Sequence, residues 1–315
     1  MLRAGSFFLG VFLLFGGLVS AAQASVSPLV SVQWLKDNPA AADRVLVDLR
    51  DQRSYASGHI PGAVHSDYGM DGWRVTVDSI PGLMPTSGKE FDHLVSKIGT
   101  LGIGNSTHVV LIAAGWGAGD MGVATRLYWS FKVLGHDRVS ILDGGMAAWL
   151  QERTPAGKPL RNPLQRGTGK NSGQEFIPAL RRNMLMNAEE TRSSMAKGQR
   201  ALDARPTMQY MGLQQSDSVL QPGTLPGAIS LPGQWVTENG GGFFRSSPAL
   251  KKLFATAGPD DGEMFVFCNT GHWASLTWFV ASELLGHTGV RMYDGSLAEW
   301  TAKINEPLEM KIRLN

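Results

Sequence analysis

Short apolar runs alternate with longer stretches of helical periodicity along most of the chain. The runs expected to form strands are 45–48, 109–113, 139–142, 201–203, 264–268 and 290–293. Amphipathic stretches at 122–134 and 274–285 follow two of these runs and are expected to be helices. Short apolar strands that alternate with helices are typical of a parallel sheet whose faces are covered by helices. The pattern therefore predicts an α/β fold.

Several sequence features occur twice, in the same order. The paired segments are 45–50 and 201–205, 58–64 and 223–229, 135–136 and 286–287, and 141–149 and 292–300. The last two pairs are each 151 residues apart (286 − 135 and 292 − 141), which is the size of a domain and not the short period of a solenoid. We therefore predict two copies of one domain in tandem.

The boundaries of the two copies follow from composition and from helix-start signals. Residues 154–174 are rich in Gly, Pro, Lys and Asn, which is typical of a linker. This places an N-terminal domain at 25–153 and a C-terminal domain at 175–315. Ser31 is expected to cap the first helix, and residues 187–190 (Asn-Ala-Glu-Glu) have the pattern of a capping box.

The first 24 residues have the pattern of a secretory signal peptide. Arg3 precedes an apolar stretch at 7–19, and residues 22–24 (Ala-Gln-Ala) offer a small-residue cleavage site. The apolar stretch is short for a spanning helix, which needs about 20 residues, and an uncleaved membrane anchor is the alternative. We expect export to the periplasm, a mature start near Ser25, and no stable membrane association after cleavage.

Composition and charge narrow the possible functions. The chain has 315 residues, of which 43% are hydrophobic and 18% charged, as in ordinary globular proteins. Its formal net charge is +2 and no block of Lys or Arg stands out, so we expect no nucleic-acid partner. The single cysteine, Cys268, precludes an intrachain disulfide and leaves either a reactive thiol or a small buried side chain.

The surroundings of Cys268 favour a reactive thiol. Cys268 ends an expected strand, and a short polar loop separates it from a helix that starts near Ala274. Ligands of open α/β sheets bind at the carboxyl ends of strands, and a helix N-terminus favours a thiolate over a thiol. Gly271 allows the loop to turn its amides toward an anion. His272 is either a cationic or hydrogen-bonding group of the site or an exposed loop residue.

With these features, the chain resembles the tandem rhodanese family of sulfurtransferases over nearly all of residues 29–301. The shared features are Asp-x-Arg after the first strand, the GHIPGAV segment, a cysteine that opens a six-residue loop, and D-G-x-x-x-x-W near each domain end. The resemblance implies that Cys268 takes the outer sulfur of thiosulfate or a mercapto acid as a persulfide. The sulfur then passes to cyanide, a thiol or a protein. In the family the N-terminal domain is inactive, which fits Ile112-Ala-Ala114 at the position equivalent to Cys268.

The resemblance also implies which residues bind the donor or the persulfide through loop amides. They are Asn269, Thr270, Gly271, His272, Trp273 and Ala274. We expect no cofactor and no metal, because Cys268 and His272 lie on a loop and structural zinc needs four ligands. An exported sulfur carrier, which holds a persulfide for a partner with little turnover, is the alternative function.

The loop departs from both common types of the family. Cys-Asn-Thr-Gly-His-Trp lacks the cations of thiosulfate-preferring members and the Gly/Ser-rich loop, ending in Val-Thr, of mercaptopyruvate-preferring members. A substrate-binding arginine often precedes the aromatic residue of an R-[FY]-x-G segment, but Gln209 stands there, before Tyr210. Arg245 is either a substitute cation or an exposed loop residue. Residues 214–221 either reshape the entrance or form a simple loop insertion.

Two other enzyme classes fit the sequence less well. Residues 117–122 (Gly-Ala-Gly-Asp-Met-Gly), with Asp143 after the next strand, match a dinucleotide fingerprint, but they occupy the loop equivalent to the cysteine loop. A phosphatase of the same fold needs Cys-x5-Arg, and position 274 is Ala. Charged residues that recur in both copies are expected to be structural, since the first copy has no nucleophile. They are Asp48, Arg50, Asp143, Asp203, Arg205 and Asp294.

Overall fold

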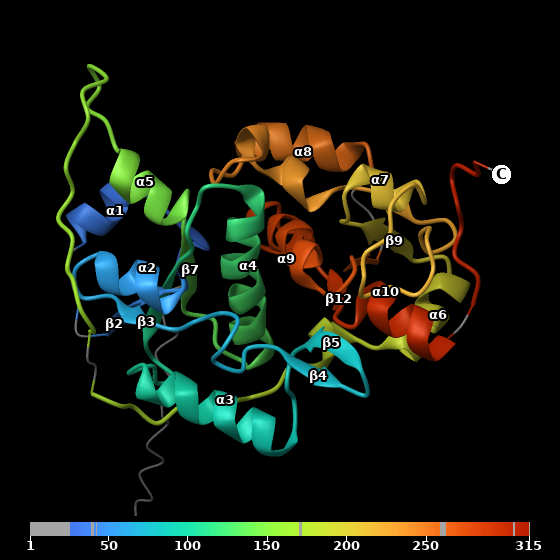
Figure 1. Ribbon diagram of the computed structural model, residues 1–315, viewed down its shortest axis with the longest axis horizontal. Helices are drawn as coiled ribbons and strands as arrows, with labels where there is room; N and C mark the ends of the chain where they lie inside the picture. Colours follow the sequence, from blue (N-terminus) through green and yellow to red (C-terminus); the bar gives the residue numbers. More distant parts are fainter. Residues whose placement is uncertain are drawn as a thin grey trace, which may run out of the picture.

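The computed structural model describes residues 26–314 except 39–40, 42, 170–171, 259–262 and 305. The predicted signal peptide at 1–24 lies outside the described residues. Each half of the chain forms a parallel sheet of five strands flanked by helices, as predicted (Figure 1). Within the part of the chain that is described, no helix is both long enough and apolar enough to cross a membrane.

The N-terminal sheet has the strand order β1-β7-β6-β2-β3. Its strands are β1 (Leu29–Val30), β2 (Arg44–Asp48), β3 (Val64–His65), β6 (His108–Ile112) and β7 (Val139–Leu142). Its helices are α1 (Val32–Asp37), α2 (Gln52–Ser57), α3 (Gly88–Thr100), α4 (Ala118–Val133) and α5 (Gly145–Gln151). Apolar side chains of α1 and α5 cover one face of the sheet, and those of α3 and α4 cover the other.

The C-terminal sheet has the equivalent order β10-β9-β11-β12-β8. Its strands are β8 (Leu185–Met186), β9 (Arg200–Asp203), β10 (Ile229–Ser230), β11 (Met264–Phe267) and β12 (Arg291–Tyr293). Its helices are α6 (Ala188–Ala196), α7 (Thr207–Tyr210), α8 (Ser247–Ala255), α9 (His272–Phe279) and α10 (Ser296–Glu299). The six predicted strands agree with the structure to within one residue at each end, whereas α4 begins four residues before the predicted start.

Local hydrogen bonds explain where the helices begin. Ser31 caps α1, because its hydroxyl accepts a hydrogen bond from Trp34 N at 3.0 Å. In the predicted capping box, Asn187 Oδ1 accepts from Glu190 N at 2.9 Å and Glu190 Oε2 accepts from Asn187 N at 3.0 Å. Both caps were predicted correctly.

The repeated Asp-x-Arg motif has the same structural role in both halves. Arg50 Nη2 donates to Asp48 Oδ2 at 2.6 Å and to the carbonyl of Gly58 at 2.7 Å. The equivalent Arg205 donates to Asp203 Oδ2 at 2.6 Å, and to the backbone at an equivalent turn, again at 2.7 Å. Each arginine thus ties the end of a strand to the Gly-x-x-Pro-Gly turn, a role that requires no substrate.

The segment at 154–174 lies against the N-terminal domain. Gln165 pairs with His59 through two backbone hydrogen bonds of 2.9 Å, and its side chain accepts from Gly62 N at 2.8 Å. At the equivalent place in the second half, Glu309 pairs with Thr224 through bonds of 2.8 and 2.9 Å. Each domain therefore ends with a segment that returns across its own Gly-x-x-Pro-Gly turn.

The two domains pack through α4 and α9, which lie side by side at the centre of Figure 1. The hydroxyls of Thr125 and Ser275 share a buried hydrogen bond of 2.8 Å, and Tyr128 donates to Glu283 Oε2 at 2.5 Å. One hydrophobic core cluster contains residues of both helices. The domains thus share a continuous apolar interior.

Each domain also extends a segment to the other. A hairpin of β4 (Val75–Val77) and β5 (Ile80–Leu83) reaches the C-terminal domain beside α10 (Figure 1). Just after it, Met84 N donates to Asp294 Oδ2 at 2.8 Å. In the opposite direction, Phe244 N donates to Asp143 Oδ1 at 3.0 Å. The recurring aspartates that directly follow β7 and β12 therefore each hold a backbone amide of the other domain.

Candidate active site

Cys268 lies directly after β11, in the position that the sequence predicted. It is buried, with 1% of its surface exposed. Its amide donates to Ser296 Oγ at 3.0 Å, and its carbonyl accepts from Leu297 N at 3.1 Å. These bonds fix the backbone of the cysteine to the turn that follows β12.

The loop after Cys268 leaves backbone amides available. Among the described residues, no acceptor binds the N–H groups of Asn269, Thr270 or Gly271. Helix α9 begins at His272, and the amides of its first turn lack partners within the helix. Such a run of free amides at a helix N-terminus suits a thiolate, a persulfide or another small anion.

Gly271 is required for the shape of this loop. Its φ angle is +78°, in the left-handed region that favours glycine. A Cβ atom there would overlap Nη1 of Arg126 and lie 3.0 Å from the carbonyl oxygen of Asp294. The loop therefore turns where the two domains are in close contact.

His272 is a hydrogen-bonding residue, and it is neither exposed nor cationic. Its Nε2 lies 3.0 Å from the carbonyl oxygen of Gly119, which can only accept, so Nε2 carries the proton. Nδ1 then accepts from the hydroxyl of Tyr68 at 3.1 Å. Burial, and next the charge of Arg74, lower the pKa of His272 to about 4, so the ring is neutral at pH 7. The imidazole therefore links α9 to two segments of the N-terminal domain.

Tyr68 and Arg74 come from the N-terminal segment between β3 and β4, which carries no recognisable motif. Burial raises the pKa of the Tyr68 hydroxyl, while the positive charge of Arg74 and Arg126 lowers it and the negative charge of Cys268 raises it. The hydroxyl thus stays protonated and lies near both Cys268 and the two arginines. Arg74 Nη2 donates to the carbonyl and the hydroxyl of Thr270, each at 3.0 Å.

A buried ion pair lies against the loop that follows Cys268. Arg126 on α4 is fully buried and lies 2.5 Å from Asp294 Oδ1. Its guanidinium also donates to the carbonyls of Gly82, at 3.1 Å, and Gly271, at 3.4 Å. Its central carbon lies 4.7 Å from the centre of the Trp129 ring. The sequence offered one signal for this residue, an arginine within an otherwise apolar stretch of helix.

The remaining predicted residues have other contacts. Asn269 Nδ2 donates to Gln209 Oε1 at 2.8 Å, so the residue at the expected arginine position holds the loop through an amide. Trp273 is half-buried and Ala274 is buried. Arg245 donates to the carbonyl of Trp235 at 2.7 Å and lines a cavity of about 500 Å³ that does not include Cys268.

The equivalent loop of the N-terminal domain is in backbone contact with the C-terminal domain. Ala113 takes the position of Cys268, since its carbonyl accepts from Met146 N at 2.8 Å as the cysteine carbonyl accepts from Leu297 N. A Cβ atom on Gly242 would overlap the carbonyl of Gly115, so the backbones of the two domains touch there. The C-terminal domain thus lies against this loop, while Gly117 and Gly119 of the dinucleotide-like segment line the cavity of about 500 Å³ that also includes Arg245.

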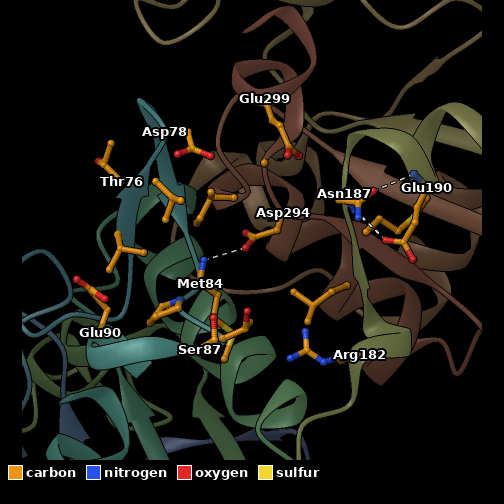
Figure 2. A pocket seen from close by; sticks show the side chains of 18 residues that line it. Thr76, Asp78, Met84, Ser87, Glu90, Arg182, Asn187, Glu190, Asp294 and Glu299 are labelled. Atoms are coloured by element: carbon orange, nitrogen blue, oxygen red, sulfur yellow. Dashed lines mark hydrogen bonds between the residues drawn. The ribbon is translucent and has the colours of Figure 1, made fainter. Parts of the chain in front are cut away.

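A cavity lies next to the site but is separate from its loop. It measures about 760 Å³ and lies between the β4–β5 hairpin and the C-terminal domain (Figure 2). Asp294 lines it, while the ion pair of Asp294 with Arg126 faces the loop of Cys268. Figure 2 shows Arg182 and Glu299 on opposite sides of this cavity.

Comparisons with known proteins agree with this architecture. The model of the rhodanese-like domain matches residues 31–152 and 187–303. A Mycolicibacterium smegmatis protein named "Putative thiosulfate sulfurtransferase" is 33% identical over 296 residues, which cover 90% of this chain and 97% of that protein. The Thermus thermophilus sulfur carrier protein TtuD is 30% identical over 290 residues, covering 89% and 95%.

Solved structures share the fold. The Escherichia coli protein SseA, described as a 3-mercaptopyruvate sulfotransferase, superposes with a TM-score of 0.71 at 22% identity, over 86% of this chain and 99% of that one. EanB in complex with ergothioneine superposes with a TM-score of 0.73 at 20% identity, over 91% of this chain and 70% of that one. With two matched domains and relatives that align along nearly their whole length, this chain belongs to the rhodanese family and is a tandem-domain sulfurtransferase.

Proposed function

We propose that this sulfurtransferase moves the outer sulfur of a small anionic donor to a thiophilic acceptor through a persulfide on Cys268. The observation that carries the proposal is the position of Cys268: the chain's single cysteine directly precedes a run of backbone amides without protein acceptors among the described residues, at the start of α9. These amides stabilise a thiolate before the reaction and a persulfide after it.

The reaction needs no cofactor for its balance. With thiosulfate, the Cys268 thiolate attacks the outer sulfur, a new S–S bond forms, the S–S bond of thiosulfate breaks, and sulfite leaves with the electron pair. With 3-mercaptopyruvate, sulfur transfer leaves pyruvate, whose methyl group receives the proton of the donor thiol. An acceptor such as cyanide then attacks the outer sulfur of the persulfide, leaves as thiocyanate and restores the thiolate.

The names of the relatives support two donors and one alternative role. The mycobacterial relatives are named for thiosulfate, whereas the solved Escherichia coli protein is named for 3-mercaptopyruvate. The Thermus relative is named as a sulfur carrier. A carrier would form the same persulfide and differ only in passing the sulfur to a protein partner with little turnover on small acceptors.

We also propose that the chain is exported to the periplasm after cleavage near Ser25. The support is the charged start, the apolar stretch at 7–19 and the Ala-x-Ala pattern at 22–24. Mass measurement of the mature protein from a periplasmic extract would give the cleavage point directly.

The deciding experiment for the mechanism is cyanolysis with thiosulfate and, in parallel, with 3-mercaptopyruvate. Thiocyanate formation by the wild type and its loss in Cys268→Ser would establish the cysteine mechanism, and the donor with the higher kcat/KM would be the preferred one. Sulfur loading is followed in the same samples by intact mass. Loading without turnover would favour the carrier role, whereas neither loading nor turnover would exclude the proposed mechanism.

A further inference from the structure

We propose that Arg74, from the N-terminal domain, binds the anionic group of the sulfur donor at the Cys268 loop. The inference rests on the proposed persulfide mechanism and adds the residue that recognises the substrate. The loop itself contains no Lys or Arg, and Gln209 occupies the place of the arginine expected in the family. A positive charge for the donor therefore has to come from another segment.

Arg74 is held at the loop by two directed contacts. Its Nη2 donates to the carbonyl and the hydroxyl of Thr270, two residues after Cys268. Its Nε donates to the carbonyl of Gly82 at 3.2 Å, at the end of the β4–β5 hairpin. A guanidinium fixed in this way has lost most of its rotamer freedom before a ligand binds, which favours recognition of an anion.

The charge of Arg74 is not neutralised by a carboxylate of the described residues. No Asp or Glu oxygen among them lies within 4.0 Å of its guanidinium nitrogens. Arg126 differs, because it is fully buried and paired with Asp294. Arg74 is only partly buried, so a small anion has access to it. Of these two arginines next to the loop, Arg74 is therefore the one that offers positive charge to a substrate.

The contacts of Arg74 place its charge close to the reacting cysteine, because Thr270 is two residues after Cys268. The guanidinium carbon lies 5.6 Å from the centre of the Tyr68 ring. The Tyr68 hydroxyl interacts both with the positive charge of Arg74, which lowers its pKa, and with the negative charge of Cys268, which raises it. Because Arg74 contacts the same loop that follows Cys268, we infer that a donor at the cysteine places its sulfonate or carboxylate near this guanidinium.

The catalytic consequence is specific to the donor half of the reaction. Sulfite carries two negative charges as it leaves, and a cation close by stabilises both the bound donor and this product. The acceptor step needs no such contact, since cyanide attacks a persulfide that the loop amides already hold. Loss of Arg74 should therefore affect the donor and leave the acceptor largely unaffected.

The test compares Arg74→Gln and Arg74→Lys with two other arginine variants. Arg245→Gln removes the cation that the sequence suggested, and Arg53→Gln removes an exposed arginine of α2 as a matched control. A hydrogen bond to a charged group contributes about 1.5–3 kcal/mol, so Arg74→Gln should raise the KM for thiosulfate by about 10- to 100-fold. The KM of Arg74→Lys for thiosulfate should lie between those of the wild type and Arg74→Gln. The KM for cyanide should change less than about twofold.

A second readout does not depend on turnover. Sulfite or thiosulfate should slow the alkylation of Cys268 by iodoacetamide in the wild type and in Arg53→Gln, but not in Arg74→Gln. This separates the two proposals: Arg74-dependent protection without sulfur loading would support the anion site while excluding the persulfide mechanism. An active wild type with normal donor KM and normal protection in a folded Arg74→Gln would exclude the role of Arg74 alone.

Two further outcomes also count against the proposal. If the donor and cyanide KM values and kcat change together in Arg74→Gln, the arginine shapes the loop and does not bind the donor. If Arg245→Gln raises the donor KM and Arg74→Gln does not, the anion site lies on the other side of the loop. Arg74→Lys, which keeps the charge, guards against a variant that fails to fold, and its melting temperature is compared with that of the wild type.

Discussion

Replacing Asp143 with Asn should stabilise the protein at neutral and alkaline pH, even though the aspartate recurs in both domains. Asp143 directly follows β7, and its Oδ1 accepts from Phe244 N at 3.0 Å. Among the described residues it has no ion pair, and burial raises its pKa to about 6. An Asn side chain can keep the accepted hydrogen bond through its own Oδ1 without a buried charge.

The sign and the size of this stability change follow from the difference between the pKa of Asp143 in the folded and the unfolded protein. In the unfolded chain the carboxyl titrates near its ordinary value of 3.8, whereas in the folded protein it titrates near 6. Between these values the folded state binds the proton more strongly, so stability falls as the pH rises from about 4 to about 6. At about 1.4 kcal/mol per pKa unit the full penalty is about 3 kcal/mol. Partial exposure of Asp143 reduces this to about 1–2 kcal/mol.

The equivalent substitution in the other domain should act in the opposite direction. Asp294→Asn leaves the guanidinium of Arg126 fully buried without a counter-charge. Removing one partner of a buried ion pair typically costs about 3–5 kcal/mol. The two variants are therefore a matched pair, with the same change at the same position of a repeated motif and opposite expected effects.

The assay is urea unfolding of the wild type, Asp143→Asn and Asp294→Asn between pH 4 and pH 8, followed by tryptophan fluorescence. The midpoint of Asp143→Asn should match that of the wild type near pH 4 and exceed it increasingly up to pH 7. If the urea midpoint of Asp143→Asn lies below that of the wild type by the same amount at every pH, the reasoning is refuted, because the aspartate would then act through its hydrogen bond alone.

Three further predictions follow from single contacts. Ser296→Ala should cost about 1–3 kcal/mol in urea unfolding and slow sulfur loading measured by mass, because the buried amide of Cys268 loses its acceptor. Tyr55→Phe should cost a similar amount and make the segment around Gly169 more sensitive to limited proteolysis, since the buried Tyr55 hydroxyl accepts from Gly169 N at 2.9 Å. Ala113→Cys in a Cys268→Ser background should gain no sulfur by intact mass, because the loop after Ala113 is in close backbone contact with Gly242 of the other domain.

The sequence was informative where a structural signal is local. Strands of three to five residues, two helix caps and the strand-to-helix position of Cys268 all follow from periodicity or from short motifs. The repeat predicted two similar domains, and both sheets have the equivalent strand order. By contrast, β1, β3, β8 and β10 have two residues each, which is too short for a period to be recognised.

The part of the site that comes from the other domain could not be predicted. Tyr68 and Arg74 lie on a segment without periodicity, and their importance depends on how the two domains pack. His272 was identified as a site residue, but its neutral state follows from burial and from the positive charge of Arg74, a residue of the other domain. Local sequence determines where a loop lies in its own domain, whereas its charge environment depends on contacts that join residues about 200 positions apart.

The unequal distribution of charge across the interface gives the two equivalent loops different environments on similar backbones. Counted from the N-cap of each helix, Arg126 is ninth after Gly117 on α4, and the ninth residue after Gly271 is Val280. The aspartate that follows β12 therefore meets an arginine of the other domain, while the aspartate that follows β7 meets only a backbone amide among the described residues. The N-terminal domain gives the cysteine loop fixed cations and a tyrosine, whereas the C-terminal domain gives the alanine loop a tight run of glycines. The loop after Ala113 therefore has no thiol and, among the described residues, no hydrogen bond from an arginine of the other domain.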